Sequence, residues 1–237
     1  MEPLTWTGNL AVLNPIFLGL WAIFALAVIA QILLSFTAMA PELQGGALAA
    51  KKTPFDHAST AVQWSFGLII VVTLAYLVGG LLLPSPEAKG IIGTISSRLL
   101  PVWIALAVTF ALSITFKRKL GLYGKLFDSN IGMIGFGIVM FWVFTAIFGG
   151  MDMIVTHDPL AQVSGMKNKV PGTPTPDGDG IYPYYLLGGD NLARDVFSRA
   201  VKGSWEVIKI APFATLFAFM VGITLGLPAA YYGGKLD

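Results

Sequence analysis

Cysteine is absent from this chain of 237 residues, and charged residues make up only 12% of it. The absence of cysteine excludes disulfide bonds, thiolate metal sites and a cysteine nucleophile. Soluble domains carry about twice this share of charged residues, whereas here 55% of residues are hydrophobic and the mean hydropathy is +0.74. The net charge of +2 is too small to indicate a nucleic acid partner. The composition therefore predicts an all-α protein that crosses a lipid bilayer several times.

Signatures of catalysis are also missing. The sequence has no Walker A, GxSxG or HExxH pattern, so nothing supports nucleotide hydrolysis or acyl transfer by this chain. The run DGDG at Asp177 to Gly180 lacks the later ligands of a calcium loop and is interpreted as a plain turn. We expect no catalytic, cofactor-binding or metal-binding residues, and His57 and His157 lie on opposite sides of the membrane in the topology predicted below.

Five stretches are apolar and long enough to cross the hydrocarbon core, which requires about 20 residues. None of them contains Asp, Glu, Lys, Arg or His, so the sequence shows no intramembrane ionisable path for protons or ions. The predicted polytopic helix bundle has spans at Ile16–Phe36, Ala61–Leu83, Leu99–Phe116, Ile131–Gly150 and Ile210–Tyr231.

The placement of basic residues predicts the orientation of these spans. Lysines and arginines cluster after the first, third and fifth spans, and the segment before the first span has none. The positive-inside rule then places the N-terminus outside and the C-terminus in the cytoplasm. The residues that decide this are Lys51, Lys52, Lys117, Arg118, Lys119, Lys125 and Lys235.

The segment between the fourth and fifth spans, Met151 to Lys209, is the only sizeable extramembrane piece that we predict. Its middle, KNKVPGTPTPDGDGIYPYY, contains four prolines and several glycines. Because proline fixes φ and removes a hydrogen-bond donor, we expect a loop rather than a packed domain.

The end of this segment, YYLLGGDNLARDVFSRAVKG, has helical character. Asp190 is the expected N-cap, and Phe197, Val201 and Trp205 recur every four residues as an apolar face. This pattern predicts an amphipathic helix that lies in the membrane interface before the last span; a ligand or catalytic site is the less favoured interpretation. Acid–base pairs four residues apart would stabilise the helix: Asp190 with Arg194, Asp195 with Arg199, and Lys202 with Glu206.

The run from LLGGDNLARDVFSRAVKG to the terminal LPAAYYGGKLD resembles the C-type permease subunit of dipeptide, oligopeptide and nickel ABC transporters. Members of that family carry LGTDxxGRDxxSRxxxG, followed by a span that ends in a form like GxxxGxxAGYxGGxxD. Two departures stand out, since Gly189 replaces the usual Thr and Ala193 the usual Gly. The matching positions are Asp190, Arg194, Asp195, Ser198, Arg199, Gly203, Gly222, Gly226, Ala230, Tyr232, Gly233, Gly234 and Asp237.

The resemblance implies a division of the chain. Residues 129–237 would be the first part of an importer permease core, with two transmembrane helices and a periplasmic loop that carries the motif helix. Residues 1–128 would be an N-terminal extension with three transmembrane helices. Gly222 and Gly226 have the spacing that allows close helix packing, and Tyr232, Gly233 and Gly234 would mark the cytoplasmic end of the fifth span.

The implied partners are a second permease subunit, cytoplasmic ATPase subunits and a periplasmic substrate-binding protein, in a bacterial inner membrane. Family members continue past the GGxxD segment with further helices and a loop that docks on the ATPase. No such loop follows Asp237, so we expect only the first two core helices here. The leading hypothesis is a permease subunit that forms part of a translocation pathway and does no chemistry. The alternative is a non-transporting accessory or structural subunit of a larger membrane complex, derived from a truncated permease.

Overall fold

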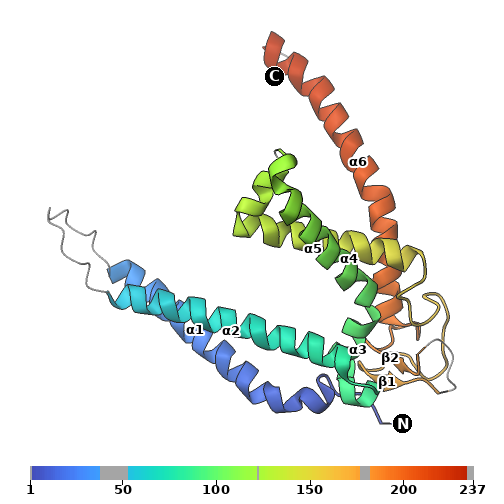
Figure 1. The fold of residues 1–237 in the computed structure, drawn as a ribbon. Coiled ribbons are helices and arrows are strands. Elements are labelled where there is room, and N and C mark those ends of the chain that lie inside the picture. Colours follow the sequence, from blue (N-terminus) through green and yellow to red (C-terminus); the bar gives the residue numbers. More distant parts are fainter. Residues whose placement is uncertain (1, 38–52, 122, 177–181, 234–237) are drawn as a thin grey trace. The chain divides into compact units, whose positions relative to one another are not determined.

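A computed structural model describes residues 2–37, 53–121, 123–176 and 182–233. Within these residues, five helices are long and apolar enough to cross a membrane (Figure 1). The predicted all-α, multi-span fold class is therefore confirmed. The candidate spans are Gly8–Phe36, Pro54–Leu82, Leu100–Lys119, Asn130–Gly150 and Val196–Tyr232.

The chain forms two compact units, Leu4–Ser96 and a second that contains Ser97–Asp237. Helix α4 (Leu100–Phe116) groups with the later helices, although the resemblance places a boundary after residue 128. The two divisions concern different properties, because compact units reflect packing and the boundary at 128 reflects relatedness. The latter stays a prediction.

In the first unit, α1 (Asn14–Thr37) packs along α2 (Pro54–Leu82), after a short 3-10 helix η1 (Gly8–Leu13). Both long helices are apolar on all sides, as helices in a membrane are. A capping box begins α2, because Thr53 Oγ1 accepts from the backbone N–H of Asp56 and the Asp56 carboxylate accepts from that of Thr53. The hydroxyl of Tyr76 joins the two helices by donating to Oδ1 of Asn14 over 2.8 Å.

Helix α3 (Pro86–Arg98) occupies the connection that the sequence analysis treated only as a short link. It is broken at Gly90, whose φ of +66° suits glycine. At this break the backbone N–H groups of Ile91 and Ile92 donate to the carbonyls of Thr5 and Trp6. The break therefore anchors the N-terminal segment within the first unit.

In the second unit, α4 is joined to α5 (Asn130–Gly150) by two 3-10 helices, η2 (Lys117–Lys119) and η3 (Gly124–Asp128). Helix α5 then packs against α6 (Val196–Tyr232). Two short antiparallel strands, β1 (Thr173–Pro174) and β2 (Tyr184–Tyr185), lie in the segment between α5 and α6.

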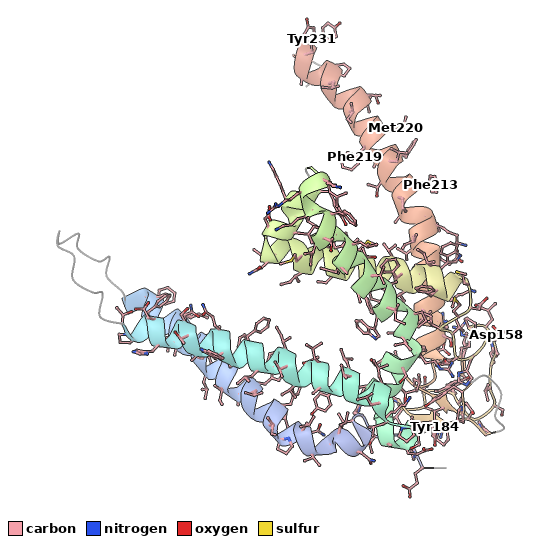
Figure 2. The ribbon with its side chains drawn as sticks, in the orientation of Figure 1. Asp158, Tyr184, Phe213, Phe219, Met220 and Tyr231 are labelled. Carbon is pink, nitrogen blue, oxygen red and sulfur yellow. The ribbon has the colours of Figure 1, made fainter. Side chains whose placement is uncertain are left out.

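Helix α6 is continuous over 37 residues, whereas the sequence analysis expected a separate interfacial helix followed by a span. At about 1.5 Å per residue it is roughly 55 Å long, nearly twice the thickness of a hydrocarbon core. Its last part is apolar and exposed, and Phe213, Phe219, Met220 and Tyr231 project from it (Figure 2). Its first part belongs instead to the folded region described next.

Candidate functional site

The segment between α5 and α6 is packed more tightly than a proline-rich loop was expected to be. Tyr184 and Tyr185 of β2 are 1% exposed, and Ile154 and Leu186 are completely buried. The expectation of a loop without a packed core was therefore wrong for the described part of this segment. Aromatic and aliphatic side chains between the prolines supply the buried area. The predicted turn at 177–180 lies outside the described residues.

The N-cap of α6 is Asp195, so the prediction of Asp190 as N-cap was wrong. The carboxylate of Asp195 accepts hydrogen bonds from the backbone N–H groups of Phe197 and Ser198, each over 3.2 Å. These two groups are among the helix-terminal donors that have no partner within the helix. Asp195 itself is 0% exposed.

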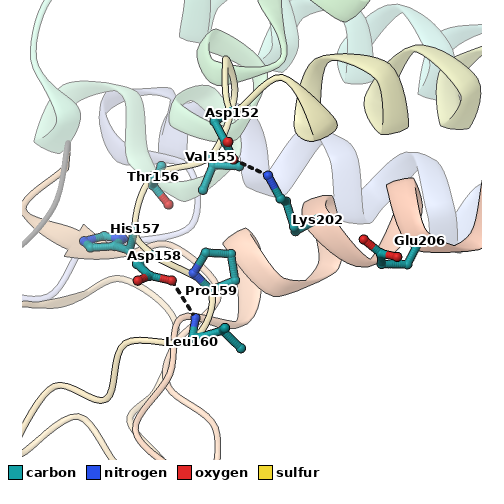
Figure 3. A pocket seen from close by; sticks show the side chains of 9 residues that line it. All are labelled: Asp152, Val155, Thr156, His157, Asp158, Pro159, Leu160, Lys202 and Glu206. Atoms are coloured by element: carbon teal, nitrogen blue, oxygen red, sulfur yellow. Dashed lines mark hydrogen bonds and ion pairs between the residues drawn. The ribbon is translucent and has the colours of Figure 1, made fainter.

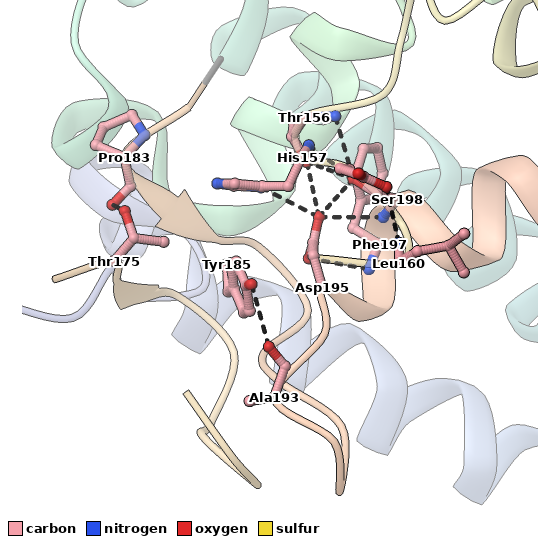
Figure 4. A network of polar contacts seen from close by, with 11 residues as sticks. Thr156, His157, Leu160, Thr175, Pro183, Tyr185, Ala193, Asp195, Phe197 and Ser198 are labelled. Carbon is pink, nitrogen blue, oxygen red and sulfur yellow. Dashed lines mark hydrogen bonds and ion pairs between the residues drawn. The ribbon is translucent and has the colours of Figure 1, made fainter. Parts of the chain in front are cut away.

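A buried polar network surrounds this cap (Figure 4). Oδ2 of Asp195 accepts from Ser198 Oγ over 2.6 Å and from Thr156 Oγ1 over 2.9 Å, and lies 3.3 Å from His157 Nδ1. Ser198 Oγ accepts in turn from the backbone N–H groups of Thr156 and His157. Each of the four residues is at most 5% exposed. The network therefore ties residues 156–157 to the first turn of α6.

Burial and hydrogen bonding act on Asp195 in opposite directions. Burial favours the neutral acid, but hydrogen bonds from His157, Ser198 and Thr156 favour the carboxylate and hold the pKa of Asp195 below its usual value. The side chain is consequently ionised at neutral pH and can accept all of the donors that face it.

The network contains Ser, His and Asp but is not arranged as a hydrolytic triad. In a triad the imidazole lies between the nucleophile and the acid. Here Ser198 donates directly to Asp195, and His157 Nδ1 faces the same oxygen. His157 Nε2 is buried and has no hydrogen-bond partner among the described residues. The geometry suits a helix-capping role rather than activation of a serine.

Asp190 organises the turn that precedes the helix. Its Oδ1 accepts from the backbone N–H groups of Leu192 and Arg194, and its Oδ2 accepts from Arg194 Nε over 2.9 Å. Arg199 Nη1 also contacts Oδ2. Partial burial opposes ionisation, but the contacts with Arg194 and Leu192 outweigh it and hold the pKa of Asp190 well below its usual range.

Of the three predicted acid–base pairs, one forms and two do not. Asp190 and Arg194 do form an ion pair, but in the turn before the helix rather than on it. Arg199 pairs with Asp190 and not with Asp195, because the Asp195 carboxylate points into the buried network. The third predicted pair is also wrong, since Lys202 reaches back to Asp152, and Glu206 pairs with Lys209 over 2.8 Å.

The predicted apolar face of the motif helix packs within the chain. Phe197 and Val201 are each 4% exposed. Gly149 at the end of α5 lies so close that a Cβ placed there would be 2.6 Å from Cγ1 of Val201, and one on Gly150 would be 2.6 Å from the ring of Trp205. Because α5 covers this face, it is not free to lie on a membrane surface as the sequence analysis expected.

An open pocket of about 630 Å³ lies beside the network (Figure 3). Its wall includes the polar side chains of Asp152, Asp158, Lys202 and Glu206, with Pro159 and Leu160 supplying apolar area. No local sequence pattern predicts this pocket, because its lining combines residues about 50 positions apart. Asp152 lies in a turn with a positive φ of 58° and belongs to no periodic pattern that would mark it as a pocket residue.

The remaining predicted positions lie on the exposed part of α6 or at its end. A Cβ added to Gly203, Gly222 or Gly226 would meet nothing within 4 Å. The helix packing predicted for Gly222 and Gly226 therefore has no partner among the described residues and stays a prediction. Tyr232 is the last residue of α6, and Gly233 follows with a φ of +60°; Gly234 lies outside the described residues. In residues 2–37, 53–121, 123–176 and 182–233, no group of three or more His, Asp or Glu side chains is placed to hold a metal ion.

No family model matches the chain, and no solved structure matches it. Three relatives are permease proteins. The glutathione transport system permease protein GsiD of Pectobacterium atrosepticum is 45% identical over 53 residues, 22% of this chain and 18% of that protein. The dipeptide transport system permease protein DppC of Haemophilus influenzae is 39% identical over 59 residues, covering 25% and 20%. The DppC protein of Alkalihalophilus pseudofirmus is 28% identical over 115 residues, covering 48% and 34%.

These comparisons confirm the predicted resemblance to permease subunits of peptide transport systems. The chain spans about a fifth to a third of the length of the curated relatives it matches.

Proposed function

We propose that this chain is a transmembrane subunit of a peptide-type ABC importer in a bacterial inner membrane, where it forms part of the translocation pathway. Two observations support the proposal. The relatives are permease proteins of dipeptide and glutathione transport systems, and the described chain has five helices able to cross a bilayer. Its proposed partners are a second permease subunit, cytoplasmic ATPase subunits and a periplasmic substrate-binding protein.

The observation that carries most weight is the structural use of the motif. Asp190 closes the turn before α6, and Asp195 and Ser198 form the buried cap that joins this helix to the preceding segment. The motif therefore ties the start of α6 to the segment before it, and its two arginines both pair with Asp190. Such a junction suits a subunit that moves or holds helices and does no chemistry itself.

The proposed orientation places this junction in the periplasm, the N-terminus outside and the C-terminus in the cytoplasm. Its support is the placement of Lys and Arg under the positive-inside rule. Reporter fusions test it: alkaline phosphatase inserted at exposed Gly165 should be active, and the same enzyme fused after Asp237 should be inactive. The opposite pattern would reverse the orientation.

Affinity purification of the tagged full-length chain from its native host tests the importer proposal. We expect ATPase subunits and a second permease subunit to be recovered in fixed ratio, and the Asp190→Ala variant to retain less of this complex. Glu2→Ala, which removes an exposed carboxylate elsewhere in the chain, is the matched control. Identification is by quantitative mass spectrometry after mild detergent extraction.

The second candidate function is a non-transporting subunit of a larger membrane assembly. The compact unit Leu4–Ser96 favours it, because its two long helices leave large apolar side chains such as Trp64 and Leu82 exposed for further packing. Recovery of the chain in a stable membrane complex without an ATPase would support this candidate and reject the importer.

A further inference from the structure

The connection between α4 and α5 carries a concentration of positive charge that the importer proposal does not use. We call residues 117–121 and 123–128 the basic turn. It holds four cations and only Asp128 as an acid. Lys117 Nζ pairs with Asp128 Oδ1 over 3.0 Å. Within the described chain, Arg118 and Lys125 are exposed and form no ion pair.

The basic turn is a folded element rather than a loose link. The ring of Phe127 packs at right angles to Phe110 and is 5.3 Å from the ring of Phe136, which joins η3 to both neighbouring helices. The hydroxyl groups of Tyr123 and Ser113 lie 3.0 Å apart, within hydrogen-bonding distance. The positions of the charged side chains along the backbone are thus set by packing.

Close backbone contact inside the turn reinforces this rigidity. A Cβ added to Gly124 would lie 2.0 Å from the carbonyl oxygen of Lys117, so only glycine fits at this position. The contact brings η2 against η3. Lys125 is thereby held on the same small surface as Lys117 and Arg118, although the sequence separates them by several residues.

A pocket of about 370 Å³ opens on this surface, with Lys117, Arg118, Lys125 and Asp128 among its lining residues. Exposed apolar residues adjoin the lining residues in the chain: Phe116 precedes Lys117 and is 46% exposed, and Leu120 precedes Gly121 and is 41% exposed. Because α4 and α5 are candidate membrane spans, their connection lies at the depth of the lipid headgroups. Exposed apolar residues next in the chain to pocket-lining residues match a phospholipid, whose charged phosphate continues into acyl chains.

We propose that the basic turn binds the headgroup phosphate of an anionic phospholipid, with Arg118 and Lys125 as the principal contacts. Guanidinium and ammonium groups are the side chains that hold phosphate in proteins, and basic pockets between transmembrane helices recognise anionic headgroups. If these cations served only to orient the spans, their number near the membrane would be sufficient. Their convergence on one pocket of a rigid turn would not be required.

The test uses the purified full-length chain in a neutral detergent. Native mass spectrometry counts bound lipid during titration with phosphatidylglycerol or phosphatidylcholine, and thermal unfolding is measured alongside. We expect phosphatidylglycerol to remain bound and to raise the unfolding temperature by several degrees, and phosphatidylcholine to do neither. Inorganic phosphate alone is the third arm. If it protects as well as the lipid, the site is a plain anion site and the lipid proposal fails.

A pair of double variants locates the binding. The variant Arg118→Gln with Lys125→Gln should weaken phosphatidylglycerol binding at least tenfold. The control Lys167→Gln with Lys169→Gln removes the same charge from exposed positions between α5 and α6 and should bind as the parent chain does. Both pairs lie on the surface, and circular dichroism checks that the variants fold. Equal lipid binding by the two double variants would overturn the proposal.

Discussion

Ser198 Oγ donates a hydrogen bond of 2.6 Å to Oδ2 of Asp195, and both side chains are completely buried where α6 begins. The same serine oxygen accepts from the backbone of His157, 41 residues earlier in the chain. One residue pair therefore caps a helix and anchors the segment that precedes it. This dual role makes the pair the natural target of the first experiment.

Replacing Asp195 by Ala should destabilise the chain by about 3 kcal/mol, because the helix loses its cap and buried donors lose their acceptor. The variant Asp195→Asn keeps a side-chain oxygen and a good N-cap, so we expect roughly half of that loss. Thermal unfolding in detergent measures both. Unfolding of Asp195→Ala at the temperature of the parent chain would show that the network does not stabilise the fold.

The same carboxylate predicts a pH dependence. The pKa of Asp195 is lower in the folded chain than the value of about 3.9 expected when it is unfolded. Its contribution to stability is therefore present above pH ~4 and is lost as the pH falls through the folded pKa. Unfolding temperatures at pH 7, 5, 4 and 3 should decline more steeply for the parent chain than for Asp195→Asn. Asp190 contributes with the same sign in both proteins, so parallel curves would contradict the assignment to Asp195.

Two positions depart from the permease pattern described above. Introducing the residue of that pattern at each position should change the stability of the chain in opposite directions. Ala193 has a φ of +61°, a conformation that disfavours a side chain by about 1–2 kcal/mol. Ala193→Gly should stabilise the chain by about 0.5–1 kcal/mol after allowance for the freer unfolded state. Gly189→Thr should destabilise it by about 1–3 kcal/mol, because a Cβ at residue 189 would lie 1.9 Å from the carbonyl oxygen of Met166.

Chemical denaturation of these two variants in the same detergent gives the comparison directly. Stabilisation by both substitutions would mean that the turn at residues 188–195 relaxes to a different backbone conformation that accepts threonine at position 189. In that case the close contact with Met166 would not limit the residue at position 189.

The contact between α5 and α6 can be tested with two glycines of one helix. Gly149→Ala should weaken the packing by about 1–3 kcal/mol, since its Cβ would collide with Val201. Gly135→Ala is the matched control, because Gly135 is exposed and has nothing within 4 Å of an added Cβ. Alanine has the higher helix propensity, so the control should be neutral or slightly stabilising. Protease accessibility of the α5–α6 segment and unfolding temperature report the difference; equal behaviour of the two variants would argue against the close helix contact.

Much of the fold was predictable because apolar runs of sufficient length have few alternatives to a membrane helix. The predicted spans Ile16–Phe36 and Ile131–Gly150 lie wholly within α1 and α5. The start of α6 was placed too early because Asp190 and Asp195 are equally good caps by residue type. Which of them caps the helix depends on Thr156 and His157, whose approach no local pattern reveals.

The sequence by itself determined the number of long apolar helices in the described chain, the approximate location of each, and the relatedness of its last part to peptide-system permeases. Hydrophobic length and a run of matching residues carry that information locally. Only the tertiary structure decided the partners of the charged side chains: Asp195 with Ser198 and His157, Arg199 with Asp190, and Lys202 with Asp152. An ion pair forms with the nearest accessible opposite charge, and after folding that charge can come from a residue 50 positions away as readily as from the next helical turn.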